Sequence, residues 1–481
     1  MNFISFTFLV FVVIVFCLYW FVFGRNLRWQ NLLVVAASYV FYGWWDWRFL
    51  LLIAFTSLCS WASGLLIGRF RDTPRKARVV SAANIILNLG ILALFKYYDF
   101  FAQSFADLFL GGRSDGLLLH LILPVGISFY TFQALSYSID VYRGRIEPVR
   151  DVVQFLAYVS FFPQLVAGPI ERATTLLPQF GRQRTFDYAQ AVDGLRQMLW
   201  GFFKKVIVAD NCAVYVDDVF AHAQVFSGMQ LMVGAFFFAF QIYGDFSGYS
   251  DIAIGTAKLF GIRLTANFRT PYFSRNIAEF WRRWHISLMT WFRDYVYFPL
   301  GGSRCSKLKV IRNTFIVFLL SGLWHGAAWT YVAWGAYNAV LFLPLIVSGR
   351  GRKFRDDIAP GRLLPSGTDF LRMLLTFFLV MLGWILFRAE SLAAAADFFL
   401  RMWQWGPGSG LDFLLTGPFL VRIVWIVPMV IVEWVSRAES HGLSMKGIRS
   451  RAVRYLIYFI LTALILLCAD NTAPNFIYFQ F

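Results

Sequence analysis

The chain has 481 residues, of which 59% are hydrophobic and 15% are charged, and its formal net charge is +17. A soluble domain carries about a quarter of charged residues, so this composition excludes an ordinary soluble globular protein. The Lys and Arg residues stand between long apolar runs, as the positive-inside rule requires, and therefore do not point to a nucleic-acid partner. Part of the positive charge can also serve anionic ligands or lipid head groups.

Apolar runs that could cross a membrane recur along the whole chain. A span needs about 20 apolar residues. Candidate spans are 3–23, 30–47, 49–68, 79–97, 117–139, 195–215, 228–248, 310–324, 327–348, 368–388, 416–434 and 452–469. The runs do not alternate between apolar and polar residues, which favours helices over barrel strands. The sequence therefore predicts an all-α polytopic membrane protein with about 11 or 12 transmembrane helices.

The loops between these spans indicate an orientation. Basic residues cluster after the first, third, fifth and ninth spans and before the last, whereas loops 98–116 and 216–227 are poor in Lys and Arg. Because basic loops stay in the cytoplasm, both termini are predicted outside it. The run 3–23 lacks a basic leader and a cleavage site, so it is expected to be a retained span. The stretch 152–170, interrupted by prolines and glycines, is predicted to be re-entrant or interfacial. A single membrane domain over 1–481 is expected, with the chemistry within 240–340.

One stretch, Leu319–Asn338, combines a single histidine, His325, with three tryptophans and no formal charge. An ionisable side chain within an apolar span is costly and usually lines a cavity or a pathway. Burial would favour the neutral imidazole, which can accept a proton. The following Gly326, Ala327 and Ala328 leave room for a substrate or for a close helix contact. The alternative is a packing histidine that is hydrogen-bonded to a neighbouring helix.

A second histidine, His285, lies in the basic and aromatic segment 274–298. On a continuous helix, Trp281, His285, Leu288 and Phe292 would share one face. The segment could equally be an amphipathic helix at the cytoplasmic interface, in which His285 is an incidental polar residue. We expect the fold to bring the two histidines to one pore.

Other polar residues within the apolar runs have simpler explanations. Asp140, Asp245 and Asp251 are expected to pair with basic residues, with a polar tunnel as the alternative. The five cysteines have no paired spacing, so neither a disulfide framework nor a metal site is predicted.

Three motifs around the histidines together resemble the signature of membrane-bound O-acyltransferases. They are the WHISL of 284–288, the RDYVYFPLGG of 293–302 and the LWHGA of 323–327. The likeness covers nearly the whole chain. The motifs at 162–170, 245–255 and Phe476–Phe481 favour the branch that acetylates bacterial polysaccharides.

The resemblance implies a ring of tilted helices around a thin centre, where a cytoplasmic and an external funnel meet. It implies that His325 is the catalytic histidine, which acts as general base on an acceptor hydroxyl or orients the acyl carbonyl. His285 matches the family's second functional position and would position or polarise the acyl donor. The residues expected to line the tunnel are Trp324, Trp329, Asp245 and Asp251.

The implied donor is an acetyl group on a cytoplasmic thioester, most simply acetyl-CoA, and no bound cofactor is expected. Phosphates of such a donor would suit the guanidinium and ammonium groups of a basic segment. The candidates are Arg282, Arg283, Arg304 and Lys307.

The resemblance also implies a place and partners. The chain would lie in a bacterial inner membrane with both termini in the periplasm. Periplasmic or membrane-anchored proteins would receive the acetyl group and complete the O-acetylation of an exported, alginate-like polysaccharide. The aromatic C-terminus, Phe476–Phe481, could dock such a protein.

Two alternatives remain open from the sequence. The same chemistry could serve another envelope polymer, by D-alanylation of teichoic acid or by acetylation of peptidoglycan or cellulose. A transporter of a polymer or of a lipid-linked precursor would explain the interrupted spans and the buried polar groups. That hypothesis does not explain the two histidine motifs.

Overall fold

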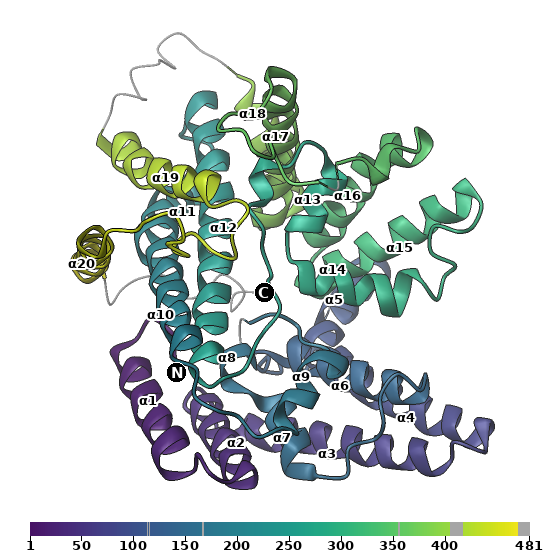
Figure 1. Ribbon diagram of the computed structural model, residues 1–481. Coiled ribbons are helices and arrows are strands. Elements are labelled where there is room, and N and C mark those ends of the chain that lie inside the picture. Colours follow the sequence, from purple (N-terminus) through teal and green to yellow (C-terminus); the bar gives the residue numbers. More distant parts are fainter. Residues whose placement is uncertain (113, 115, 166–167, 355, 405–416, 470–481) are drawn as a thin grey trace. The chain divides into compact units, whose positions relative to one another are not determined.

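The computed structural model describes residues 1–112, 114, 116–165, 168–354, 356–404 and 417–469, which form helices and connecting loops (Figure 1). The predicted all-α class is confirmed. The chain divides into two compact units. Unit 1 comprises Met1–Leu195 and Ala253–Thr265, and unit 2 comprises Arg196–Ile252 and Ala266–Phe481. The single domain over 1–481 stays a prediction.

Unit 1 is a set of helices joined by buried polar contacts. Its elements are α1 (Phe6–Cys17), η1 (Leu18–Val22), α2 (Leu27–Gly43), α3 (Arg48–Arg69), α4 (Pro74–Leu92), η2 (Ala93–Tyr97), α5 (Tyr98–Phe109), α6 (Ile127–Tyr142), α7 (Val152–Ser160), α8 (Phe162–Leu165), α9 (Ala173–Phe180) and the beginning of α10 (Tyr188–Phe202). Between α3 and α4, Ser60 lies 3.2 Å from Oδ1 of Asn84 and accepts a hydrogen bond from Asn88 at 3.3 Å. Small and polar side chains of this kind allow helices to pack closely in a membrane.

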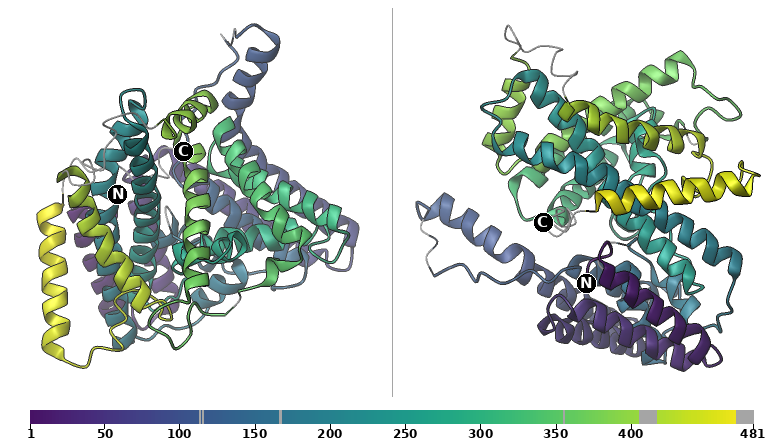
Figure 2. Two further views of the ribbon diagram at one scale, coloured as in Figure 1. Left: turned by 90° about the horizontal axis from the view of Figure 1, so that it is seen from above. Right: turned by 90° about the vertical axis from the view of Figure 1, so that its left-hand side faces the viewer.

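Unit 2 contains both histidines. Its elements are η3 (Phe203–Ala209), α11 (Asp210–Ala221), most of α12 (Gly228–Leu259), η4 (Pro271–Phe273), α13 (Ile277–Arg283), α14 (Ile286–Phe292), η5 (Arg293–Tyr297), α15 (Lys307–His325), α16 (Trp329–Val347), η6 (Arg350–Arg352), α17 (Gly367–Arg388), α18 (Leu392–Met402), α19 (Gly417–Val435) and α20 (Arg451–Cys468). Helices α15 and α16 form a closely packed hairpin. Helix α20 buries none of its residues and stands at the edge of this unit, in yellow in Figure 2.

Several helices begin where the sequence supplies a capping side chain. An asparagine or a serine accepts hydrogen bonds from the first free amides of the helix, which otherwise have no partner. Such caps are Asn26 for α2, Asn276 for α13, Ser366 for α17 and Ser450 for α20. Within the described residues, η1, η2, η3 and η5 are π-helical turns that continue an α-helix. Such turns are rare and frequently mark functional sites.

In the described part of the chain, six helices are long and apolar enough to cross a membrane. They are Arg48–Arg69, Pro74–Phe109, Gly228–Leu259, Trp329–Val347, Gly367–Arg388 and Arg451–Cys468. This number is lower than the 11 or 12 predicted, and several of the other apolar runs form shorter or interrupted helices. In the run 117–139, for example, the helix starts only at Ile127, after Gly126 with a φ of 75°. The expected interruption of 152–170 separates α7 from α8, and residues 166 and 167 lie outside the described ranges.

Candidate active site

His325 is the last residue of α15 and lies within an aromatic box. Its side chain is buried, and its ring centroid lies 5.0 Å from that of Trp324 and 5.2 Å from those of Trp334 and Phe387. The box therefore draws on α15, α16 and α17. An ionisable ring within such apolar surroundings is costly and usually functional.

Glycines allow α15 and α16 to approach each other at this point. A Cβ at Gly322 would clash with the carbonyl oxygen of Tyr331, and one at Gly326 would clash with the ring of Tyr331. A Cβ at Gly335 would clash with the carbonyl oxygen of Phe318. The sequence left two explanations for the small residues after His325, room for a substrate or a close helix contact. At Gly326 the structure shows a close helix contact, with the ring of Tyr331 in α16.

The structure overturns one prediction about His285. The expected continuous helix, with Trp281, His285, Leu288 and Phe292 on one face, does not form, because α13 ends at Arg283 and α14 begins at Ile286. Between them His285 has a φ of 44° and a ψ of 53°. This left-handed conformation costs a residue other than glycine about 1–2 kcal/mol. Strain of this kind persists where the surrounding structure enforces it, and it often marks functional sites.

His285 and His325 lie close together in unit 2, with ring centroids 6.2 Å apart. The side chain of His285 is 1% exposed and meets the ring of Phe246 edge-on at 4.7 Å. Neither of its ring nitrogens has a hydrogen-bond partner in the described part of the chain. Burial lowers the pKa of His285 to about 3, so the ring is neutral at physiological pH. A buried polar ring in this state is equipped to hydrogen-bond a bound molecule.

The two acids predicted to line the tunnel both form ion pairs in unit 2, a buried one for Asp245 and a partly buried one for Asp251. Asp245 lies 2.8 Å from the Nζ atom of Lys205, and Asp251 lies 2.6 Å from that of Lys204. Asp140, in unit 1, lies 3.3 Å from Arg145. The expectation that these acids pair with basic residues is confirmed. The two lysines were not predicted as partners from the sequence, although their position in the apolar run 195–215 was a signal.

The two tryptophans predicted to line the tunnel differ in position. Trp324 is buried, and its ring centroid lies 5.0 Å from that of His325 and 5.7 Å from that of His285. Trp329 begins α16 and is 51% exposed, so it is not part of the buried box. Phe387, which packs against His325 from α17, was not predicted from the sequence, where it is one of several aromatic residues in that helix.

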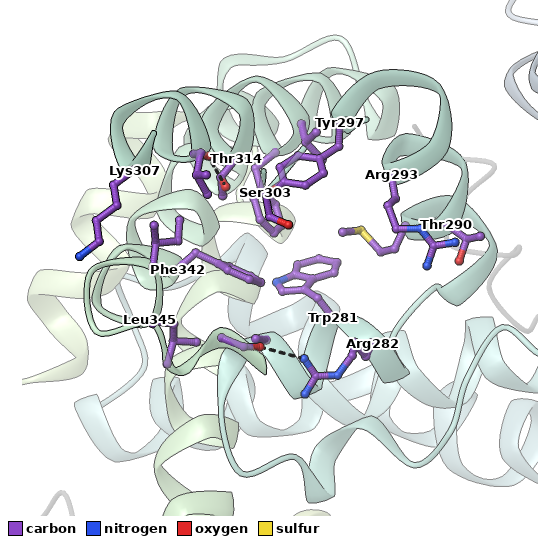
Figure 3. A pocket seen from close by; sticks show the side chains of 18 of the residues that line it. Trp281, Arg282, Thr290, Arg293, Tyr297, Ser303, Lys307, Thr314, Phe342 and Leu345 are labelled. Atoms are coloured by element: carbon purple, nitrogen blue, oxygen red, sulfur yellow. Dashed lines mark hydrogen bonds between the residues drawn. The ribbon is translucent and has the colours of Figure 1, made fainter. Parts of the chain in front are cut away.

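Two of the four predicted donor-binding residues, Arg282 and Lys307, line a cavity of about 830 Å³ in unit 2, here called the Trp281 cavity. Its wall includes Trp281, Arg282, Arg293, Lys307 and Phe342, but neither histidine. Figure 3 shows the two aromatic side chains in the cavity, with the two arginines at one end and Lys307 at the other. Arg283 and Arg304 do not line it.

Each basic residue at this cavity also makes a contact with the protein. Arg282 donates hydrogen bonds to the carbonyl oxygens of Gly351, Lys353 and Phe354. Lys307 donates to the carbonyl oxygen of Val347 at 3.3 Å. Outside the cavity, Arg283 forms an ion pair with Glu279 at 3.1 Å. Arg282 and Lys307 are therefore anchored to the end of α16 and to the segment that follows it.

Among the described residues, no three His, Cys, Asp or Glu side chains form a cluster that could hold a metal ion. All five cysteines are free.

The fold and the site define an integral membrane protein with two buried histidines in contact with aromatic walls. The sequence profile of the membrane-bound O-acyltransferase family matches residues 149–357, which contain both histidines. The chain is 42% identical over 380 residues to a probable alginate O-acetylase of Pseudomonas aeruginosa, covering 79% of this chain and 71% of that protein.

Two further relatives extend this likeness. A probable alginate O-acetylase of Pseudomonas putida is 37% identical over 476 residues, covering 94% of this chain and 95% of that protein. A peptidoglycan O-acetyltransferase of Helicobacter pylori is 36% identical over 400 residues, covering 78% of this chain and 73% of that protein. The chain therefore belongs to the membrane-bound O-acyltransferase family and is an acyltransferase.

Proposed function

We propose that this enzyme takes an acetyl group from a cytoplasmic thioester and transfers it across a bacterial inner membrane for the O-acetylation of an exported, alginate-like polysaccharide. The observation that carries the proposal is the buried pair His285 and His325, with ring centroids 6.2 Å apart. The names of the relatives from the two Pseudomonas species support the choice of polymer.

In this mechanism His325 acts as general base. Its imidazole takes the proton of an acceptor hydroxyl as the hydroxyl oxygen attacks the thioester carbonyl. The new C–O bond forms as the C–S bond breaks, and the proton then passes to the leaving thiolate. The aromatic box limits access of water to the ring, which disfavours hydrolysis of the thioester.

His285 positions or polarises the donor. It is a neutral ring, and neither nitrogen has a hydrogen-bond partner among the described residues. One nitrogen of a neutral imidazole carries a proton, and in this proposal it donates that proton in a hydrogen bond to the thioester carbonyl oxygen. Charge that develops on this oxygen would then be stabilised at a buried site.

The donor in this proposal is acetyl-CoA, and its phosphates bind the basic residues of the cytoplasmic segment. Arg282, Arg283, Arg304 and Lys307 remain the candidates. The position of Arg282 and Lys307 on the wall of one cavity favours these two. Arg293, which was not among the predicted candidates, lines the same cavity. Ionised phosphates bind guanidinium and ammonium groups by charge-assisted hydrogen bonds.

The acceptors in this proposal are periplasmic or membrane-anchored proteins, which pass the acetyl group to the polysaccharide. Both termini of the chain face the periplasm. The C-terminal residues Phe476–Phe481, proposed as the docking segment, lie outside the described ranges. Deleting 476–481 should reduce co-purification of the acceptor protein without reducing membrane insertion, and unchanged co-purification would exclude this role.

The test is the O-acetyl content of exported polysaccharide in cells that carry wild type, His325→Ala or His222→Ala at matched membrane levels. His222 is an exposed histidine paired with Asp218 and serves as the control. We expect loss of O-acetyl groups in His325→Ala alone, with polymer yield unchanged. Loss of the polymer itself, with the remainder fully acetylated, would contradict acyl transfer centred on His325.

A second acceptor is favoured by one specific observation, the 36% identity to the peptidoglycan O-acetyltransferase of Helicobacter pylori. Measurement of O-acetyl groups on peptidoglycan in the same strains separates the two polymers. Acetyl loss confined to peptidoglycan would replace the polysaccharide with peptidoglycan and leave the histidine chemistry unchanged.

A further inference from the structure

His285 occupies a backbone conformation that it would not adopt unaided. Its φ of 44° and ψ of 53° lie in the left-handed region, and its side chain is 1% exposed. A histidine held there must be fixed by contacts on both sides of it, because the left-handed conformation is unfavourable for a residue with a Cβ atom.

The backbone of segment 267–269 holds the two sides of His285. The amide of Ile286, directly after it, donates to the carbonyl oxygen of Asn267 at 2.9 Å. The amide of Arg269 donates to the carbonyl oxygen of Arg283 at 3.0 Å. These two hydrogen bonds bracket His285 and account for the interruption between α13 and α14.

The side chain of Asn267 links this segment to two helices. Its Nδ2 atom donates to Oγ of Ser250, in α12, at 3.2 Å, and its Oδ1 atom accepts from Oγ of Ser287, in α14, at 2.7 Å. Asn267 is 1% exposed. A buried amide that uses both a donor and an acceptor fixes the distance and the orientation between the elements it connects.

The next residue along the segment completes the support by packing. The ring of Phe268 lies 4.9 Å from that of Phe246 and 5.1 Å from that of Trp284. Phe246 in turn meets the ring of His285 at 4.7 Å. One side of the imidazole of His285 is therefore fixed by the ring of Phe246, which packs against Phe268. The backbone around His285 is fixed by hydrogen bonds to segment 267–269.

We propose that Asn267 is a positioning residue for His285. It acts through Ser287, Ser250 and the Ile286 amide, and it holds the imidazole at its distance from His325. This inference rests on the proposed role of His285 in acetyl transfer. A merely structural asparagine would contribute to folding without a specific effect on the catalysed step.

The first experiment measures kcat and KM for acetyl transfer from labelled acetyl-CoA, using the full chain in membranes at matched protein levels. We expect Asn267→Ala to lower kcat by about 10- to 100-fold, because small misplacements at an active site cost this much. KM for acetyl-CoA should change much less. Asn267→Ala removes the hydrogen bonds to Ser250 and Ser287 but keeps the backbone bond to the Ile286 amide. Ser287→Ala, which removes only one of the two side-chain bonds, should show a smaller loss of kcat and provides the readout if Asn267→Ala does not accumulate.

Asn84→Ala is the matched control. Asn84 is also a buried asparagine that joins two helices through a serine, in unit 1, where its Oδ1 atom lies 3.2 Å from Oγ of Ser60. It should lower the amount or the thermal stability of the protein without a specific loss of kcat. A control that lost kcat as strongly as Asn267→Ala would overturn the positioning role.

The second experiment combines each variant with His285→Asn, which removes the imidazole but tolerates the left-handed conformation. If Asn267 acts through His285, Asn267→Ala should cause no further loss of activity in this background. Losses that multiply would show independent effects and would overturn the inference.

The activity of His285→Ala distinguishes a failure of the positioning role of Asn267 from a failure of the proposed role of His285. Wild-type activity in His285→Ala would refute the proposed role of His285 and, with it, the positioning role. An inactive His285→Ala beside a fully active Asn267→Ala would overturn the positioning role alone.

Discussion

The ammonium group of Lys205 lies 2.8 Å from the Oδ1 atom of Asp245, and both side chains are buried in unit 2. The same ammonium group lies 2.6 Å from Oδ1 of Asp210. One cation therefore neutralises two acids, so the two partners of the pair are not equivalent. Removing either partner of a buried ion pair leaves an uncompensated charge.

We expect Lys205→Met to be more damaging than Asp245→Asn. The lysine substitution removes the cation beside one buried carboxylate, Asp245, and one partly buried carboxylate, Asp210, and should cost about 3–5 kcal/mol, whereas Asp245→Asn leaves Lys205 paired with Asp210. The measurement is the thermal unfolding and membrane yield of the two variants. A larger loss for Asp245→Asn would contradict this charge balance.

The hairpin of α15 and α16 should depend on the absence of a side chain at Gly322. A Cβ there would clash with the carbonyl oxygen of Tyr331, so Gly322→Ala should separate the helices, displace His325 and cost about 1–3 kcal/mol. Unfolding in detergent measures the loss of stability, and the rate of acetyl transfer measures the displacement of His325.

Gly90→Ala is the control for that substitution. Gly90 lies in α4, and nothing lies within 4 Å of the position of its added Cβ. The exchange should be neutral or stabilising by up to about 1 kcal/mol, because alanine favours a helix over glycine. Equal losses in both variants would mean that close packing at Gly322 is not the cause.

The stability of the protein should depend on pH through His285. Its pKa in the folded protein is lowered to about 3 from an ordinary value of 6.5, so between these values the unfolded chain binds more protons than the folded one. The contribution of the neutral His285 ring to the free energy of unfolding is therefore fully present above pH 6.5. Between pH 6.5 and about 3 it falls by about 1.4 kcal/mol for each unit by which the pH is lowered.

Comparison of wild type with His285→Asn isolates this contribution. Between pH 6.5 and 5, the free energy of unfolding of wild type should fall by about 2 kcal/mol more than that of the variant. Chemical unfolding in detergent at several pH values is the measurement. Parallel curves for the two proteins would contradict the burial of a neutral imidazole.

The proposed role of Lys307 predicts an effect on the donor alone. Lys307→Ala should raise KM for acetyl-CoA by about tenfold, the cost of one charge-assisted hydrogen bond, with little change in kcat. Lys309→Ala is the matched control, because Lys309 is an exposed lysine of the same helix that does not line the Trp281 cavity. The same rise of KM in both variants would indicate a general charge effect.

The sequence by itself determined the class of the fold and singled out the two histidines of the candidate site. Long apolar runs with few charges can satisfy their backbone in a membrane only as helices, so the all-α class followed from composition. His325 stood out because an ionisable group in an apolar run is costly. Motif resemblance added His285 and the family.

Only the tertiary structure decided how the two histidines are presented. The helical periodicity of 274–298 predicted one continuous helix, but hydrogen bonds from the distant segment at Asn267 hold His285 in a left-handed conformation that local propensity disfavours. The pairing of Asp245 with Lys205 likewise joins residues far apart in the chain. Such contacts depend on packing between segments, so a single sequence can mark a residue such as Lys205 as unusual but does not show which partner it meets.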